Sequence, residues 1–156
     1  MPDVSVEVKG LDELERKIGG LATLRTVRVG LKAGAVHVKG KADDYPPSTI
    51  ANSPGNPKGR WYERGYGPRW MTRQGVHGRK TSQTLGRKWT MAERNNGMTF
   101  IIGNNVTYGP YVQDREKQAW FHRQRGWRTV QDVAEDELDT VTRFVQQEID
   151  KQLSKP

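Results

Sequence analysis

Apolar and polar residues alternate at the start of the chain and then change to a helical spacing. Valine occupies every second position of Val4–Val8, which is typical of a short strand with one apolar face. After Gly10, leucine and isoleucine recur three or four residues apart within 11–21, with charged residues between them. The pattern therefore predicts a strand followed directly by an amphipathic helix.

A second helical pattern covers residues 21–42. Leu24, Leu31 and Val38 follow one another at intervals of seven and are interleaved with other small apolar residues. The segment contains three glycines, Gly30, Gly34 and Gly40. Each of them weakens the helix by up to about 1 kcal/mol relative to alanine. Small residues also allow another helix to approach closely, but we interpret the segment as a marginal helix held by packing.

The middle of the chain predicts a β-hairpin. Arg87–Arg94 and Met98–Gly103 have the composition of strands, and the Asn95–Gly97 sequence between them is a strong signal for a tight turn. The tyrosines that follow, Tyr108 and Tyr111, suit a short helical or extended piece. We expect the hairpin to form the centre of a small antiparallel sheet.

The C-terminal pattern is the clearest in the chain. Thr129 followed by Asp132 resembles a capping box. Apolar residues then lie three or four apart as far as Leu153, which predicts one helix over 129–154, about 37 Å long at 1.5 Å per residue. Taken together, the elements predict an α+β fold in one domain, 1–156, whose small antiparallel sheet is packed by a long C-terminal helix and N-terminal helices.

Residues 45–80 have no periodicity and are rich in proline and glycine, so we expect a long irregular arm. Unlike a solvated linker, the arm carries large aromatic rings interleaved with arginines. Such residues suit single-stranded nucleic acid, through phosphate contacts and stacking, and equally protein–protein hot spots. The proline and glycine content favours an arm laid across a neighbouring subunit, with contacts from Trp61, Tyr62, Arg64, Tyr66, Arg69 and Trp70.

The charge is unevenly spread along the chain. The net charge is +8, with +8 carried by residues 56–94 and −4 by residues 129–156. A basic middle and an acidic tail indicate two different partners, or contact between copies of the chain, although a merely solubilising surface would also explain them. Basic residues that we expect to face DNA or a partner are Arg79, Lys80, Arg87 and Lys88.

The sequence contains no recognisable set of catalytic residues. The chain has no cysteine, and its three histidines lack the spacing of metal pairs. Adjacent Asp43 and Asp44 are better explained by helix termination than by a metal site, and Gly65–Gly67 is only a fragment of a glycine-rich motif. We expect neither an enzyme nor a cofactor. No signal peptide or membrane span is indicated, so we expect a soluble protein made in a cytoplasm.

The order of these elements resembles a family of long-tailed bacteriophage neck proteins, the tail-completion or minor tail-component proteins. The opening strand, glycine and leucine-rich helix of Val4–Leu14 are similar to the start of that family. The segment Thr81–Thr90 is similar to the one that precedes its hairpin, and Tyr108–Gln113 is similar to its tyrosine motif. The arm of residues 45–80 is longer than in many members, and Gln113-Asp114 replaces the usual acidic residue and glycine.

The resemblance implies a ring-forming structural subunit of the head–tail junction in the virion, made in the host cytoplasm. Its implied partners are copies of itself in a ring, for which a hexamer is one candidate, other neck and tail-tube proteins, and DNA passing non-specifically through the channel. No membrane is involved. A tail terminator of the same neck is one alternative. A basic nucleic-acid-binding accessory protein is the alternative from another class.

Overall fold

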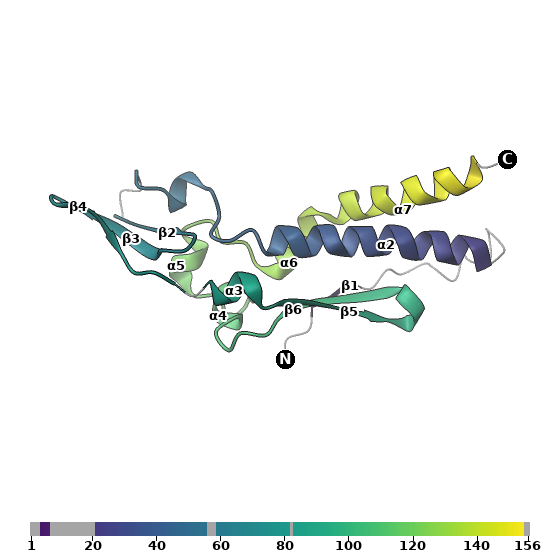
Figure 1. The fold of residues 1–156 in the computed structure, drawn as a ribbon, viewed down its shortest axis with the longest axis horizontal. Helices are drawn as coiled ribbons and strands as arrows, with labels where there is room; N and C mark the ends of the chain where they lie inside the picture. The colour runs from purple at the N-terminus through teal and green to yellow at the C-terminus, as the bar shows by residue number, and fades with distance from the viewer. Residues whose placement is uncertain (1–3, 7–20, 56–58, 82, 155–156) are drawn as a thin grey trace. The chain divides into compact units, whose positions relative to one another are not determined.

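The computed structural model describes residues 4–6, 21–55, 59–81 and 83–154 (Figure 1). The chain divides into two compact units. Unit 1 draws on Met1–Lys41, Thr90–Gly103 and Val133–Pro156. Unit 2 draws on Ala42–Trp89 and Asn104–Asp132. Helices and small antiparallel sheets are both present, which confirms the predicted α+β class.

A three-stranded sheet in the order β1-β6-β5 forms the base of unit 1. Its strands are β1 (Val4–Val6), β5 (Trp89–Arg94) and β6 (Thr99–Asn104). β1 runs antiparallel to β6, with Val4 opposite Ile102. The hairpin and the N-terminal strand therefore join in one sheet, as predicted. The helix predicted within residues 11–21 lies almost wholly outside the described residues.

The hairpin turns where the sequence predicts it. Asn95, Asn96 and Gly97 have positive φ angles of 50°, 52° and 82°. Asparagine and glycine tolerate this left-handed region better than other residues, so the turn sequence matches its backbone. Behind the turn, Phe100 and Ile102 of β6 are buried, with 6 % and 3 % of their surface exposed.

The helix α2 (Leu21–Ala42) has the predicted bounds and buries one face. That face consists of residues spaced three or four apart, namely Val27, Leu31, Ala35, Val38 and Ala42. A small apolar cavity lies between α2, the hairpin and α7 (Leu138–Leu153). Its lining residues include Leu31, Phe100 and Val141. Unit 1 thus has an aliphatic core between two helices and a sheet.

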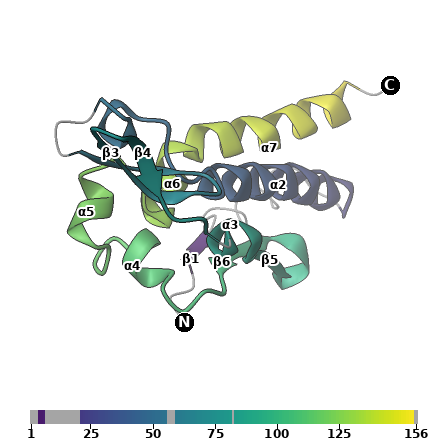
Figure 2. The same ribbon diagram turned by 60° about the vertical axis from the view of Figure 1, so that its left-hand side comes forward.

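Two glycines of α2 allow α7 to approach closely, and the helices lie side by side in both views (Figures 1 and 2). A Cβ atom added to Gly30 would lie 2.5 Å from Cα of Val145, and one added to Gly34 would lie 2.8 Å from Cγ1 of Val141. The interpretation of these glycines as mere weak points in a marginal helix was therefore incomplete, because the glycines make room for the second helix.

The predicted single C-terminal helix is wrong in one respect. It is divided into α6 (Val130–Asp136) and α7, with a break at Glu137, whose φ and ψ are −97° and 4°. The apolar spacing continues across the break, so it could not reveal it. Oε2 of Glu137 lies 2.8 Å from Nε2 of His37 on α2, a hydrogen-bond contact that depends on fold rather than on local sequence.

The predicted capping box at the start of α6 is confirmed. The backbone N–H of Thr129 donates to Oδ2 of Asp132 at 2.8 Å, and the N–H of Asp132 donates to Oγ1 of Thr129 at 3.1 Å. Two N–H groups that would otherwise be left without a helical partner are satisfied in this way.

The prediction that residues 45–80 form an irregular arm is wrong. Unit 2 contains a second three-stranded antiparallel sheet in the order β2-β3-β4. Its strands are β2 (Arg60–Glu63), β3 (Gly67–Thr72) and β4 (Gly75–Gly78). The strands are too short for alternation to stand out, and the glycines that suggested irregularity serve the turns instead. Gly65 and Gly75 have positive φ angles of 84° and 117°.

The remaining elements of unit 2 are short: the 3₁₀ turn η1 (Ile50–Asn52), α3 (Thr84–Arg87), α4 (Pro110–Gln113) and α5 (Trp120–Arg123). Because α3 ends at Arg87, the hairpin strand begins at Trp89 rather than at the predicted Arg87. None of the helices in the described part of the chain is long and apolar enough to cross a membrane.

Candidate partner-binding surface

An aromatic cluster holds unit 2 together. The ring of Trp127 lies 5.0 Å from Tyr45, 5.1 Å from Tyr62 and 4.4 Å from His122, measured between centroids. Trp61 is also buried, with 5 % of its surface exposed. The rings come from two stretches far apart in sequence, so the cluster joins residues 45–62 to residues 122–127.

Burial changes the titration of this cluster. Burial, together with the nearby positive charge of Arg125, lowers the pKa of His122 to about 4. Burial also raises the pKa of Tyr45 to about 12. The guanidinium of Arg125 lies 5.7 Å from the ring centre of Tyr62 and donates from Nη1 to the carbonyl oxygen of Phe121 at 2.8 Å. His122 is therefore neutral near pH 7 and serves as a packing residue.

Buried amides replace regular backbone pairing in the loops around the cluster. The side-chain nitrogen of Asn52 donates to the carbonyl oxygen of Tyr62 at 3.0 Å, and its side-chain oxygen accepts from the N–H of the same residue at 2.7 Å. The side-chain nitrogen of Gln118 donates to the carbonyl oxygens of Val112 and Trp127 at 2.8 and 2.9 Å. The Asn52 bonds anchor β2 to the η1 turn, and the Gln118 bonds hold the loop segments around Trp127 together.

The register of that sheet assigns its side chains to two faces. Arg60 is opposite Trp70, and Trp70 is opposite His77. Because side chains alternate along a strand, one face carries the set that we call the Trp70 face: Arg60, Tyr62, Trp70, Thr72 and His77. The other face carries Trp61, Glu63, Arg69, Met71 and Val76.

Of the predicted contact residues, two belong to the interior or the cluster. Trp61 is buried in its own chain and so does not belong to the predicted surface, because the segment that was predicted as an arm has a core of its own. Tyr62 is half-buried against His122 and Trp127. Trp70 is also half-buried, with its ring stacked on His77 at 6.3 Å.

The other predicted contact residues lie at the surface of unit 2. Tyr66 is 43 % exposed, and the guanidinium of Arg69 lies 4.6 Å from its ring centre. Nε of Arg69 lies 3.1 Å from Oε2 of Glu63, so this arginine already has a carboxylate within its own chain. Nη2 of Arg64, an exposed residue, donates to the carbonyl oxygen of Asp43 at 3.2 Å. Contact of these residues with a neighbouring subunit stays a prediction.

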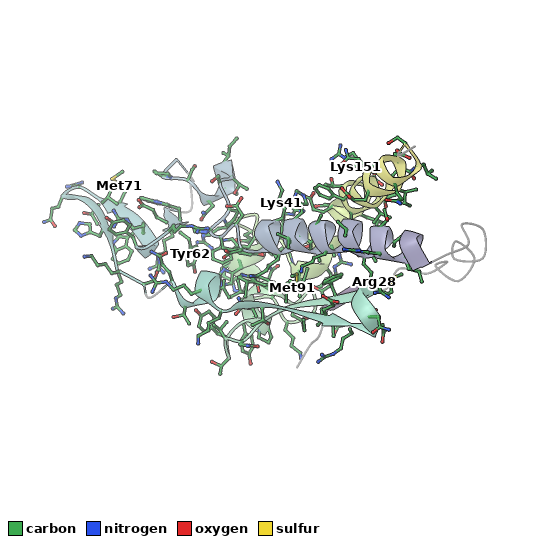
Figure 3. All side chains as sticks on the ribbon, turned by 45° about the vertical axis from the view of Figure 1, so that its right-hand side comes forward. Arg28, Lys41, Tyr62, Met71, Met91 and Lys151 are labelled. Atoms are coloured by element: carbon green, nitrogen blue, oxygen red, sulfur yellow. The ribbon has the colours of Figure 1, made fainter. Side chains whose placement is uncertain are left out.

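The predicted basic residues are all exposed. Arg79 and Lys80 follow β4, Arg87 ends α3, and Lys88 follows it. An apolar pair at the end of the β3–β4 hairpin was not predicted. Met71 is opposite Val76, and the two side chains are 56 % and 44 % exposed. Figure 3 shows Met71 at the opposite end of the sheet from Tyr62. A strand assignment for this segment would have been needed to find the pair.

The net charge of the chain resides in one of its two units. Unit 2 contains 14 basic and 6 acidic residues and so carries the whole net charge of +8. Unit 1 contains 12 of each and is neutral overall. The basic middle of the sequence thus belongs to unit 2, whereas most of the acidic tail belongs to unit 1, where basic residues of its N-terminal part balance it.

The acidic stretch 132–139, part of the acidic tail noted in the sequence, makes some of its contacts within the chain. Asp132 accepts from Nη2 of Arg115 at 2.7 Å, and Glu137 pairs with His37. Among the residues that the structure describes, no group of three His, Asp or Glu side chains could hold a metal ion. No family model, curated protein or solved structure matches the chain.

Proposed function

We propose that this chain is a structural subunit of the bacteriophage head–tail junction, which assembles with copies of itself into a ring around the DNA channel and joins the tail tube to the head connector. The proposal rests on the resemblance described above and on the way charge is distributed in the fold. It assigns the chain no catalytic role.

The order of elements supports the proposal. The resemblance implies a strand, a longer helix, a proline, a hairpin, a tyrosine motif and a closing helix. In the structure β1, α2, the β5–β6 hairpin, α4 and α7 follow one another in that order. The tyrosine motif forms α4, where Val112 is buried and Tyr111 is 62 % exposed.

The segregation of charge is the observation that carries the proposal furthest. A subunit in a ring around DNA must present a basic surface to phosphates and other surfaces to its neighbours. Unit 2, with its net charge of +8, fits the first requirement, while the neutral unit 1 and the β2–β3 turn of unit 2 are left for the second. A protein that only needed solubility would gain nothing from keeping the two kinds of surface in separate units.

Sedimentation velocity of the purified chain, without DNA and at low and high salt, tests the proposal. We expect a discrete oligomer whose size does not depend on DNA, and a ring with a central channel in electron micrographs. A monomer or dimer under all conditions would favour the basic accessory protein instead.

A variant can locate the contact between subunits. Tyr66 and Arg64 are exposed beside the β2–β3 turn, so Tyr66→Ala combined with Arg64→Glu should reduce the oligomer to smaller species without unfolding the chain. Arg94→Glu, an exposed residue at the end of β5 in unit 1, is the control for charge reversal. Equal oligomers in all three proteins would remove Tyr66 and Arg64 from the interface.

A further inference from the structure

The Trp70 face of unit 2 carries cations and rings but no carboxylate. Glu63 is the only acidic residue in the three strands, and the register places it on the opposite face, where it pairs with Arg69. Arg60 is exposed and lies opposite Trp70. The face therefore has no negative charge of its own to neutralise its arginine.

Three further cations lie next to this face, at the two ends of β4. Arg73 lies in the turn between β3 and β4, and Arg79 and Lys80 follow β4; all three are exposed. Arg79 comes two positions after His77, and the N–H of Thr81 still donates to the carbonyl oxygen of Gly65, so the chain continues beside β3. By alternation Arg79 continues the Trp70 face, whereas Lys80, one position on, belongs to the opposite side at the edge of the sheet. Within the described residues, none of the three cations forms an ion pair.

The rings of this face contact neighbouring side chains of the same sheet and do not form an exposed apolar patch. Trp70 stacks on His77 with 18° between the ring planes, and Nε2 of His77 lies 2.7 Å from the hydroxyl oxygen of Thr72. The exposed apolar pair of this hairpin, Met71 and Val76, lies on the opposite face. Protein–protein interfaces are enriched in arginine and aromatic rings, but their centre is depleted of charge. The excess of cations without a carboxylate, rather than the rings, therefore favours a polyanion.

We propose that the Trp70 face, together with Arg73, Arg79 and Lys80, binds the phosphate backbone of nucleic acid without reading its sequence. The cations at the two ends of β4 are separated by roughly 15 Å of extended chain. Duplex DNA presents on the order of ten phosphates over that length. This inference names the surface of unit 2 that faces DNA in the proposed function, but it requires no ring.

Binding of a fluorescein-labelled DNA duplex of mixed sequence, followed by anisotropy over a series of salt concentrations, tests the proposal. The test variant is R73Q/R79Q/K80Q. The matched control, R25Q/K32Q/K41Q, removes the same charge from exposed positions of α2 and so leaves the Trp70 face intact. Thermal melting confirms that both proteins are folded.

For the test variant we expect the slope of log affinity against log salt to become shallower by about 2 to 3, because each phosphate contact contributes about 0.9. Affinity at low salt should fall at least tenfold, while the control keeps most of the wild-type slope. A single-stranded probe should lose binding in the same variant, since the phosphates and not the bases are recognised.

Two outcomes would overturn the proposal. Equal losses in the test variant and the control would mean that charge acts without a defined surface. If the test variant instead kept its DNA affinity and lost its oligomer in sedimentation, the face would bind a copy of the chain. The two proposals fail separately, because a wild-type protein that binds DNA through this face as a monomer would disprove only the ring.

Discussion

The two units of this protein are stabilised by different kinds of core. Unit 1 is neutral and packs aliphatic side chains of α2 and β6, such as Leu31 and Ile102, whose contacts follow the period of the element. Unit 2 carries the net charge and is held by an aromatic cluster around Trp127, with buried amides such as Asn52 and Gln118 bonded to loop backbone. Regular periodicity is needed for the first kind of core and not for the second.

The difference has an energetic consequence. An aliphatic core spreads its burial over many similar residues, whereas unit 2 concentrates it in a few rings and in polar groups that must keep their partners. Leaving a buried polar group without a partner costs about 1–3 kcal/mol. We therefore expect unit 2 to depend more strongly on single residues and on pH than unit 1.

Removing the buried indole of unit 2 should have the largest effect. Trp61→Ala is expected to cost about 3–5 kcal/mol of unfolding free energy, because a large ring is replaced by a cavity. Chemical denaturation gives the size, and hydrogen exchange shows where protection is lost. If protection fell first in unit 2 while α2 stayed protected, the contrast between the units would be sharpened.

Tyr66→Ala is the matched variant, since this ring lies in the same sheet but is 43 % exposed. Its cost should be within about 0.5 kcal/mol, the range usual for surface substitutions. Similar losses from the two variants would break the distinction between a buried and a surface ring in this sheet.

Mild acid should destabilise unit 2 next most strongly, through His122. Its pKa is 6.5 when unperturbed and about 4 in the fold. As the pH falls from 6.5 to 4, the unfolded chain takes up a proton that the folded chain refuses, so stability is lost, by up to about 3 kcal/mol at 1.36 kcal/mol per pH unit. Unfolding free energy measured across this range should fall steadily and level off below pH 4 as far as His122 is concerned.

His122→Gln separates this effect from other acid effects. The variant should lose stability at pH 7 but show a flatter dependence between pH 6.5 and 4. Burial alone would raise the pKa of Asp132, but hydrogen bonds from Thr129 and Arg115 lower it overall. Its stabilisation is therefore lost only as the pH falls below its usual value near 4. An unchanged slope in the variant would assign the acid sensitivity to another group.

What the sequence could predict follows the same division. The bounds of α2, the turn at Asn95–Gly97 and the cap at Thr129 were all predicted, because period and turn chemistry are local signals. The break at Glu137 was missed because the apolar spacing continues across it. The contact of Glu137 with His37 joins residues far apart in the sequence, and no local pattern contains such a pairing.

The candidate site was predicted as a composition but not as a surface. Arginines and rings within 45–80 were recognised, yet their division between two faces required the register of β2, β3 and β4. Trp61 and Trp70 look alike in the sequence, and only the strand alternation puts one in the interior and the other on the basic face. A segment without strands was assigned no faces at all.

Two glycines of α2 test how closely unit 1 is packed. Alanine favours a helix over glycine by about 0.8–1 kcal/mol. At Gly40 nothing lies within 4 Å of an added Cβ, so Gly40→Ala should raise the unfolding free energy by up to about that amount. At Gly30 the added Cβ would lie 2.5 Å from Cα of Val145, a backbone atom that cannot turn aside.

Gly30→Ala should therefore lower the unfolding free energy by about 1–3 kcal/mol, the usual cost of overpacking, despite the gain in helix propensity. Denaturation midpoints of the two variants should move in opposite directions from the wild type, with unchanged slopes. If both variants were stabilised, α7 would not rest against Gly30 in solution. The neutral unit would then lack the close helix pairing that distinguishes its core from the aromatic cluster of the basic unit.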